Sequence, residues 1–521
     1  MTHAAAPTEA GAAGSKGLKA DAIGFVSNTV IGVASTAPAY SLAVSLGLVA
    51  AAVGAFSPAI MIIAFVPMVC IAVAYYYMNR ADPDCGTSFT WVAKAMGPAP
   101  GWLAGWAIIV ADVVVMASLA EVAAIYTFQL FGIDPSTWGS ITLAGQNVAL
   151  GAAATVALGV LFIIALTWIV YIGIEISART QVILLGLELF ALALFTVVAL
   201  VKVYSGAFAD GVRPELAWLN PFNISDPNAL TSGVMVALFI YWGWDTSASV
   251  NEETTDTTET PGRAAVTSTF ILIATYVLVS IAAQAVHGSE FLAKQGGEDV
   301  LGSMAGTVLG SPLSKLLIIA VLTSAAASTQ TTILPTARTV LSMAAKKALP
   351  EYFARMHPRY LTPTTATIWM GVLSIVWYVG LKIVAQNVFY DAVAALGLMI
   401  AFYYGLTGYA CAIYYRHQLL RSVKNLFLMG IVPVAGGVML TLAFVYSVIS
   451  LSNPANSASG TSWFGWGPPL VITIGFAILG VILMVVQWRR EPEFFRRPLE
   501  VAESEPLTPP ERPGLTPVGS R

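Results

Sequence analysis

Charged residues are scarce in this 521-residue sequence. Asp, Glu, Lys and Arg together make up 10% of it, whereas about 25% is usual in soluble proteins. Hydrophobic residues reach 57%, and about twelve stretches of roughly 20 apolar residues can be placed along the chain, each long enough to cross a bilayer as a helix. The composition excludes a soluble globular protein and predicts an all-α polytopic membrane protein. The net charge of −3 also argues against the basic surface that binds nucleic acid.

Cysteine and histidine are also rare. The three cysteines, Cys70, Cys85 and Cys411, lie far apart, and the four histidines have no HExxH spacing, so the sequence contains no local metal-site motif. It has no GxxxxGK[ST] loop either, which argues against ATP-driven pumping. A membrane enzyme needs a nucleophile and base, or metal ligands, at one depth, and the scattered histidines argue against that class. We therefore expect no enzymatic activity, no cofactor and no metal.

The two ends of the chain differ from the rest. Residues 1–20 contain no apolar core, and their lysines, Lys16 and Lys19, come after a stretch of small residues and not before an apolar stretch within this segment, which is not the order found in a signal peptide. Residues 489–521 contain four arginines near their start and seven prolines. Both segments are predicted to be disordered cytoplasmic tails. One transmembrane domain, residues 21–488, then carries the function.

Hydropathy predicts twelve membrane helices, which place both termini on the same side. With the N-terminus inside, the outer segments hold only five basic residues, and the other 20 of the 25 lie on the inner side. By the positive-inside rule that side is cytoplasmic, and we expect a multi-pass protein of the plasma membrane. The outer basic residues are Lys202, Arg213, Lys294, Lys315 and Lys382. The predicted spans are 23–50, 57–78, 101–131, 148–171, 179–203, 229–250, 264–287, 312–345, 364–384, 389–415, 427–451 and 468–488.

Two of these spans are interrupted. The first contains Gly32 and Pro38 in its middle, and proline removes a backbone donor and clashes with the preceding turn. Unwound backbone in a membrane is tolerated where it lines a cavity or is packed in protein, although a simple proline kink explains this span equally well. The sixth span favours the unwound interpretation, because Gly243 and Asp245 lie inside an otherwise apolar helix. A charge there costs roughly 2.5–3.5 kcal/mol on insertion scales and usually faces a cavity.

The spacing of the breaks suggests an internal repeat. Gly32 and Gly243 are 211 residues apart, and their spans open two successive groups of five, residues 23–203 and 229–415, which two further helices follow in residues 427–488. Inverted repeats of this kind bring their discontinuous helices together at a site near the bilayer midplane. Half-helix N-termini there attract an anionic group, and unwound carbonyls receive a cation or an ammonium. A zwitterion suits both.

Four motifs point to one known family. They are Gly32-Val33-Ala34-Ser35-Thr36; Pro83-Asp84-Cys85-Gly86-Thr87-Ser88-Phe89-Thr90-Trp91 with Gly97, Gly101, Trp102, Gly105 and Trp106; Trp242-Gly243-Trp244-Asp245 with Glu252-Glu253 and Pro261-Gly262-Arg263; and Ala337-Arg338-Thr339-Val340-Leu341-Ser342-Met343-Ala344 with Leu349-Pro350, Phe353 and Thr362-Pro363. Together these motifs resemble the amino acid-polyamine-organocation superfamily of transporters, in its amino acid permease branch. In this chain Cys85 replaces the first glycine of the family's usual pair, and Ala34 stands where many members have a glycine.

The resemblance implies a leucine-transporter-like fold, with two inverted five-helix repeats, two peripheral helices and alternating access to a central site. It also implies that the two breaks bind the substrate. The substrate-binding residues predicted in this way are Gly32, Val33, Ala34, Ser35, Thr36, Tyr241, Trp242, Gly243, Trp244 and Asp245.

Acids and hydroxyls in other spans are further candidates, because acids inside a membrane are functional by default. By resemblance, Asp112 lines the pocket for the substrate's side chain; the alternative is a hydrogen-bonded structural acid. Glu188 lies where some similar proton-coupled members carry a lysine, so a carboxylate there would accept a proton, ligate sodium or pair with a neighbouring helix. By resemblance, Ser324 and Ser328 face the first break and complete a cation site, although small residues also serve close helix packing. Glu121 and Asp391 have no assigned role.

The leading hypothesis is therefore a secondary active transporter, or permease, for amino acids, driven by protons or by exchange. Asp112 and Asp245 favour a cationic or amine-bearing substrate, and sodium is the alternative coupling ion. A polyamine transporter for putrescine-like substrates is the alternative function. A channel is disfavoured, because the bulky Trp242 and Trp244 beside the break suit an occluded site better than an open pore. We expect membrane lipid around the helices; the sequence does not fix the substrate, the coupling ion, the direction of transport or the oligomeric state.

Overall fold

Long helices make up almost all of the fold. The computed structural model describes residues 16–143, 146–295, 299–384, 389–457 and 459–496. These residues contain ten helical segments that are long and apolar enough to cross a membrane; the first, Phe25–Ala81, is itself long enough for two crossings. The helices are α1 (Phe25–Ser35), α2 (Pro38–Val53), α3 (Ser57–Ala81), α4 (Ser88–Met96), α5 (Pro98–Leu130), α6 (Leu150–Ile172), α7 (Ile174–Tyr204), α8 (Pro227–Ile240), α9 (Thr246–Ser249), α10 (Thr260–Gln295), α11 (Val300–Leu309), α12 (Ser314–Ala345), α13 (Thr364–Val384), α14 (Phe389–Tyr414), α15 (Val423–Asn425), α16 (Val432–Leu451), α17 (Pro468–Arg490) and α18 (Glu493–Arg496).

Several helices are longer than the spans predicted from hydropathy. The predicted fifth span, 179–203, corresponds to α7, which begins five residues earlier, and the predicted seventh span, 264–287, lies within α10, which begins four residues earlier. The backbone of α10 is not continuous, because Gly288 has φ of 78° and ψ of 169°. Hydropathy marks only the apolar middle of a helix, and polar turns at either end extend the helix beyond the hydrocarbon region.

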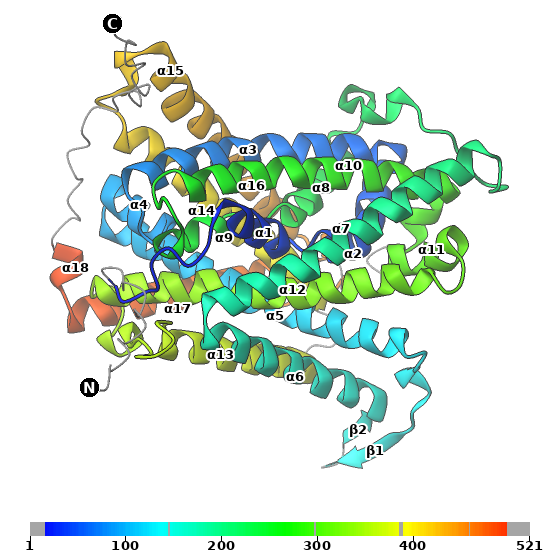
Figure 1. Ribbon diagram of the computed structural model, residues 1–521, viewed down its shortest axis with the longest axis horizontal. Coiled ribbons are helices and arrows are strands. Elements are labelled where there is room, and N and C mark those ends of the chain that lie inside the picture. The colour runs from blue at the N-terminus through cyan, green and yellow to red at the C-terminus, as the bar shows by residue number, and fades with distance from the viewer. Residues whose placement is uncertain (1–15, 144–145, 296–298, 385–388, 458, 497–521) are drawn as a thin grey trace, which may run out of the picture.

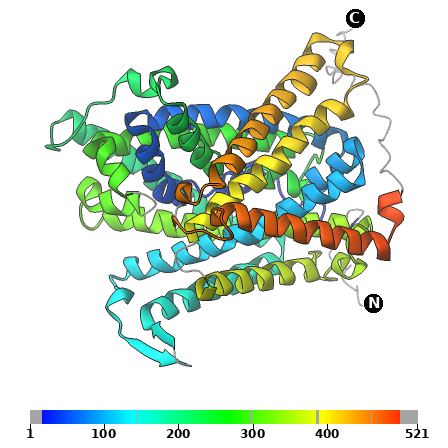
Figure 2. The same cartoon turned by 180° about the vertical axis from the view of Figure 1, so that it is seen from behind.

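The helices fall into two packed groups. In one group α10 packs against α1, α2 and α3, and α8 packs against α2 and α3. In the other group α5, α6, α12 and α13 all contact one another. Helix α12 also touches α1, α2 and α9, so the two groups meet along α12. Figure 2 shows the C-terminal helices α14, α16 and α17 across the far side of the molecule.

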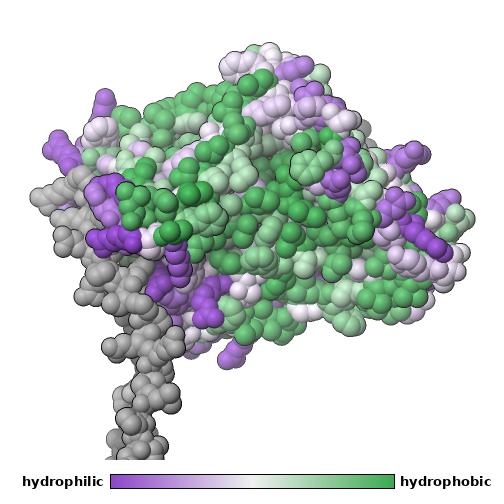
Figure 3. Space-filling view, turned by 90° about the horizontal axis from the view of Figure 1, so that it is seen from above, coloured by the Kyte–Doolittle hydropathy of each residue, from purple (hydrophilic) through white to green (hydrophobic). Residues whose placement is uncertain are grey.

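The two ends of the long axis carry different elements (Figure 1). Helices α4 and α18 lie at one end, and α11 lies at the other together with the antiparallel hairpin of β1 (Ser140–Leu143) and β2 (Gln146–Ala149). The surface between the ends is largely hydrophobic in Figure 3, and the hydrophilic residues gather toward the two ends. Such a broad apolar belt is what a bilayer covers.

Parts of both predicted tails pack against the helices. Residues 16–20, assigned to an N-terminal tail from the sequence, include Leu18, which is completely buried in a small cluster with Cys85 and Leu341. At the other end, Phe494 and Phe495 of α18 are buried in a cluster of residues from α4, α5 and α12. Residues 1–15 and 497–521 lie outside the described part of the chain. The predicted boundaries at 20 and 489 therefore do not coincide with the limits of the packed chain.

Candidate functional site

The first break lies between α1 and α2. Helix α1 ends at Ser35, and Ala37 adopts a left-handed conformation with φ of 48° and ψ of 66° before Pro38 begins α2. Proline suits the first position of a helix, because its fixed φ is helical and the amide it lacks has no partner there. The turn is closed by hydrogen bonds from the amide of Thr36 to the carbonyl of Val33, at 3.1 Å, and from the hydroxyl of Ser41 to the carbonyl of Thr36, at 2.7 Å. The helix is therefore unwound between α1 and α2, and not merely kinked at Pro38.

The second break separates α8 from α9. Residues Tyr241 to Asp245 leave the helix, and Gly243 has φ of 120°, a conformation that glycine adopts without steric cost. A Cβ atom built on Gly243 would lie 2.7 Å from the carbonyl oxygen of Ser35, so a side chain would prevent this approach. The two breaks are also joined by a 2.8 Å hydrogen bond between the hydroxyls of Ser35 and Thr246.

A small enclosed cavity lies where the two breaks meet. Its volume is about 10 Å³, which is room for about one water molecule. Five of the residues predicted to bind substrate line it: Ser35, Asp112, Trp242, Gly243 and Asp245. The remaining lining residues are Ile108, Thr246, Thr332, Pro335 and Tyr403. Both carboxylates that the sequence marks in separate spans thus converge on one cavity.

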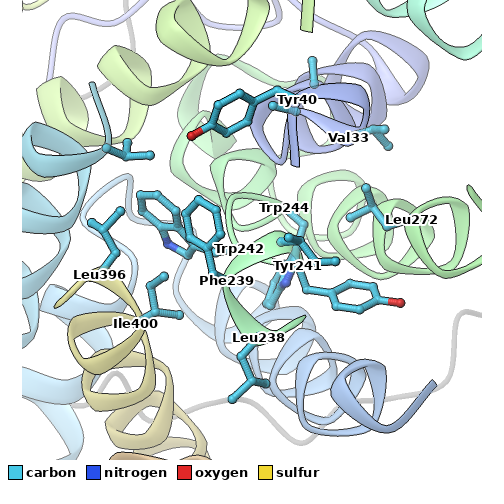
Figure 4. Close-up of a cluster of buried hydrophobic side chains, with 14 of the residues drawn as sticks. Val33, Tyr40, Leu238, Phe239, Tyr241, Trp242, Trp244, Leu272, Leu396 and Ile400 are labelled. Atoms are coloured by element: carbon cyan, nitrogen blue, oxygen red, sulfur yellow. The ribbon is translucent and has the colours of Figure 1, made fainter. Parts of the chain in front are cut away.

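The other residues predicted at the breaks do not line this cavity. Gly32 lies inside α1, where an added Cβ would collide with the hydroxyls of Ser247 and Ser268, so it allows α1 to pack closely on α9 and α10. Figure 4 shows the side chains of Tyr241 and Trp242 leaving the break in opposite directions. Tyr241 donates a 3.0 Å hydrogen bond to the carbonyl of Met61 in α3. The residues away from the cavity wall are Gly32, Val33, Ala34, Thr36, Tyr241 and Trp244.

Three tyrosines surround Asp245. The phenol of Tyr404 donates to Oδ1 at 2.8 Å, and the phenols of Tyr403 and Tyr75 donate to Oδ2 at 3.1 Å and 3.4 Å. The indole N–H of Trp242 in turn donates to the Tyr403 oxygen at 2.5 Å. These bonds hold the carboxylate in place with neutral donors. None of the three tyrosines was predicted from the sequence; the adjacent pair Tyr403-Tyr404 inside an apolar span is the signal that could have identified two of them.

Asp112 has fewer partners. It is buried in α5, and its Oδ2 accepts a hydrogen bond from the hydroxyl of Thr336 in α12. Among the described residues that line the cavity there is no Lys, Arg or His. Asp112 and Asp245 therefore face the cavity without a basic side chain to compensate them, and a buried carboxylate is costly without a countercharge. A bound cation would supply that countercharge.

Glu188 is a buried residue of α7 whose carboxylate lies against the start of α2. Its Oε1 accepts hydrogen bonds from the amide of Ala39 and the hydroxyl of Ser324, both at 2.8 Å. The positive end of a half-helix favours such a carboxylate. The Oε2 atom is buried, with no hydrogen-bond partner among the described residues. Ser328 on the same face of α12 donates to the carbonyl of Ser35 at 2.9 Å, so this face of α12 contacts the first break.

The two acids without an assigned role have local partners. Glu121 of α5 accepts hydrogen bonds from Tyr378, at 2.5 Å, and from Lys382, at 2.7 Å, both on α13. Asp391 accepts a hydrogen bond from the hydroxyl of Ser459 in the loop before α17. Neither acid lines the cavity.

Two clusters of charges lie where the loop between α3 and α4 meets the end of α12 and the residues that follow α9. Arg338 of α12 forms a bidentate ion pair with Glu253, at 2.8 Å and 2.9 Å, and both side chains are completely buried. In the second cluster the ligand-type atoms of Asp84, Cys85 and Glu252 lie within 4.8 Å of one another. This grouping would suit a metal, but the ammonium of Lys16 already lies 2.8 Å from Asp84 and 2.5 Å from Glu252. A lysine therefore supplies the positive charge there.

Comparison with known proteins agrees with this architecture. The family model described as amino acid permease matches residues 21–478. The Asc-type amino acid transporter 1 of Mus musculus is 24% identical over 443 residues, which cover 82% of this chain and 73% of the relative. The large neutral amino acids transporter small subunit 2 of Homo sapiens is 24% identical over 436 residues, 81% of this chain and 72% of the relative. An uncharacterized transporter of Mycobacterium tuberculosis is 27% identical over 365 residues, 68% of this chain and 71% of the relative. Because the family model spans nearly all of the transmembrane region, from before the first break to within α17, the chain belongs to the amino acid permease family.

Proposed function

We propose that the protein is a secondary active transporter of amino acids that works by alternating access, with a preference for cationic substrates. The observation that carries this proposal is the enclosed cavity at the contact of two broken helices, lined by Asp112 and Asp245 without a basic residue among its described lining. A cavity with room for about one water molecule represents a closed site, which must open to one side of the membrane to admit a substrate. Relatives that are named as amino acid transporters support the substrate class.

The arrangement of helices supports a rocking mechanism. If α1 and α2 form one crossing, and α8 and α9 another, the helices make twelve crossings in which the two broken helices head two groups of five. This order is compatible with the inverted repeat that belongs to the proposal. One packed group contains α1, α2, α3, α8 and α10, and the other contains α5, α6, α12 and α13. Movement of the first group against the second along α12 would open the cavity to each side in turn.

We assign Asp112 to the cationic group of the substrate. Among the described residues Thr336 donates a hydrogen bond to one oxygen of Asp112, while both oxygens of Asp245 already accept phenol hydrogen bonds. An inside-negative membrane potential adds about 2.3 kcal/mol per charge per 100 mV to the uptake of a cation. The residues proposed to contact substrate at the breaks remain those predicted from the sequence, with Ser35, Trp242, Gly243 and Asp245 on the cavity wall.

We assign ion coupling to the site of Glu188, Ser324 and Ser328. The free Oε2 of Glu188 is buried beside the first break, so protonation there would change the charge next to α2. A proton is the preferred coupling ion, and sodium or exchange is the alternative. The charge bias of the loops supports cytoplasmic termini and a plasma membrane location.

A polyamine transporter is the second candidate. The amides of Ala39 and Tyr40 at the start of α2 already donate to Glu188 and Ser324, so these donors are not available for the carboxylate of an amino acid. A diamine such as putrescine has no carboxylate and needs only the acids of the cavity. This observation favours testing amines beside amino acids.

The test is uptake into sodium-free proteoliposomes with an inward proton gradient, using labelled arginine, putrescine and leucine in parallel. Gradient-dependent arginine uptake that Asp112→Asn reduces at least tenfold supports the proposal. Putrescine uptake without arginine uptake supports the second candidate. Leucine uptake alone, unaffected by Asp112→Asn, would reject the cationic preference and keep the transporter. Counterflow from preloaded vesicles in the same preparation tests exchange and separates a carrier from a channel.

A further inference from the structure

The segment that leads into α1 crosses the cytoplasmic end of the molecule. We call residues 16–24 the strap. The amides of Ala22 and Ile23 donate to the carbonyl of Glu253, at 2.9 Å and 3.1 Å, and the amide of Thr255 donates to the carbonyl of Ile23 at 2.9 Å. The strap thus pairs with the loop between α9 and α10 as a short parallel bridge.

Lys16 fixes the other end of the strap. Its ammonium contacts the carboxylate of Asp84 at 2.8 Å, that of Glu252 at 2.5 Å and the sulfur of Cys85 at 3.8 Å. The Lys16 side chain is 14% exposed, so these contacts are largely shielded from water, which makes them stronger than surface ion pairs. The Cys85 thiol, which is next to this ammonium, donates a hydrogen bond to the carbonyl of Arg338 at 3.5 Å.

The cluster joins parts of the chain that must separate when the cytoplasmic side opens. Asp84 belongs to the loop between α3 and α4, and Glu252 follows α9. Lys346, the residue directly after α12, contacts the same Asp84 oxygen as Lys16. Burial alone would raise the pKa of Asp84, but the ammonium groups of Lys346 and Lys16 outweigh it and hold the pKa well below its usual range. The carboxylate therefore stays ionised and can attract both lysines at physiological pH.

We propose that the strap is a built-in restraint on the cytoplasmic opening, held by Lys16, and that it must detach before α1 can move away from α9 and α12. The strap is continuous with α1, so any displacement of the cytoplasmic end of α1 pulls on it. Its role in transport rests on the proposed function, because only a transporter needs this opening. The restraint itself concerns conformation alone and can be tested without substrate.

Cys85 offers a native reporter for detachment. It is completely buried beside the strap, and burial raises the pKa of its thiol well above the usual range. A neutral, buried thiol reacts slowly with alkylating reagents. When the strap detaches, Cys85 loses the cover of Lys16 and Leu18 and becomes open to reagents from the cytoplasmic side.

The experiment measures the rate of Cys85 alkylation by N-ethylmaleimide in inside-out vesicles, in full-length protein whose other cysteines are changed by Cys70→Ala and Cys411→Ala. Lys16→Met keeps the aliphatic stem and removes the charge, and we expect it to accelerate alkylation tenfold or more. Lys16→Arg keeps the charge and should stay within threefold of the unaltered lysine. The matched control is Lys19→Met, because Lys19 pairs with Glu175 near the surface, where the side chains are 33% and 46% exposed; it should leave the rate unchanged.

The outcomes separate the alternatives. Acceleration in Lys16→Met but not in Lys19→Met supports the restraint. An unchanged rate in Lys16→Met, or equal acceleration in both variants, would overturn it. If Lys16→Met does not fold, Glu252→Gln removes a partner of Lys16 from the other side and must produce the same acceleration. Because alkylation needs no substrate, failure of the proposed transport activity would not affect the result.

Discussion

Substitution of Gly243 by alanine tests whether the contact between the two breaks is needed for transport. At this position the backbone has φ of 120°, and an added Cβ would lie 2.7 Å from the Ser35 carbonyl oxygen and 3.0 Å from the Thr36 nitrogen. Both obstacles are backbone atoms, which cannot rotate away as a flexible side chain could. The strain therefore falls on the closed arrangement, in which the breaks abut.

The magnitude follows from two contributions. An L-residue held in a sparsely populated region of φ and ψ costs about 1–3 kcal/mol, and an overpacked contact costs about 1–3 kcal/mol more. Their sum of about 2–6 kcal/mol applies only while the breaks touch. Because each 1.4 kcal/mol is a factor of ten, the closed arrangement should become at least roughly 30-fold less populated.

The assay is initial uptake in proteoliposomes beside thermal unfolding of the detergent-purified protein. Gly243→Ala should lose most of its uptake while remaining a folded, monodisperse protein. Gly186→Ala is the matched control, since Gly186 lies on an open face of α7 with nothing within 4 Å of an added Cβ; it should transport normally. If Gly243→Ala retained more than half of the uptake, the reasoning that the breaks must close on each other would be wrong.

Three further predictions concern other buried groups. Glu253→Gln leaves the Arg338 guanidinium buried without a countercharge, which typically costs about 3–5 kcal/mol, so the protein should unfold at a markedly lower temperature. Adding Arg338→Met should recover most of the lost stability. A double variant that unfolds at the same temperature as Glu253→Gln would contradict this. Tyr404→Phe removes a 2.8 Å hydrogen bond to Asp245, and because bonds to charged groups contribute about 1.5–3 kcal/mol, uptake should fall about tenfold or more; wild-type uptake would show that the phenol is dispensable. Glu188→Gln keeps a hydrogen-bond acceptor but cannot gain a proton, so counterflow should persist while proton-driven accumulation is lost; accumulation that still follows the gradient would remove Glu188 from coupling.

The positions of the two breaks follow closely from the sequence. Pro38 cannot continue a helix, and Gly243 supplies a conformation that other residues adopt only with strain, so each break is fixed by a local backbone constraint. The limits of the helices were less well predicted. Hydropathy reports where a helix leaves the hydrocarbon layer, whereas the hydrogen-bonded backbone of α7 and α10 continues beyond that point.

The surroundings of the acids could not be predicted. Asp245 is enclosed by Tyr75, which precedes it by 170 residues, and by Tyr403 and Tyr404, which follow it by 158 and 159 residues. No local pattern links such positions. The separation of Asp112 from Glu121 could be predicted, because nine residues turn a helix by about two and a half revolutions, and the structure directs them to different partners.

The sequence by itself determined that this chain forms apolar helices, which loops carry the basic residues, and where two of the helices must unwind. These properties depend on composition and on backbone constraints within a few residues. Only the tertiary structure decided that the two breaks touch, that Asp112 and Asp245 face one cavity, and that Lys16 joins its own segment to the distant loops of Asp84 and Glu252. The rotation and pairing of membrane helices depend on close packing and interhelical hydrogen bonds, and these involve residues that no sequence spacing connects.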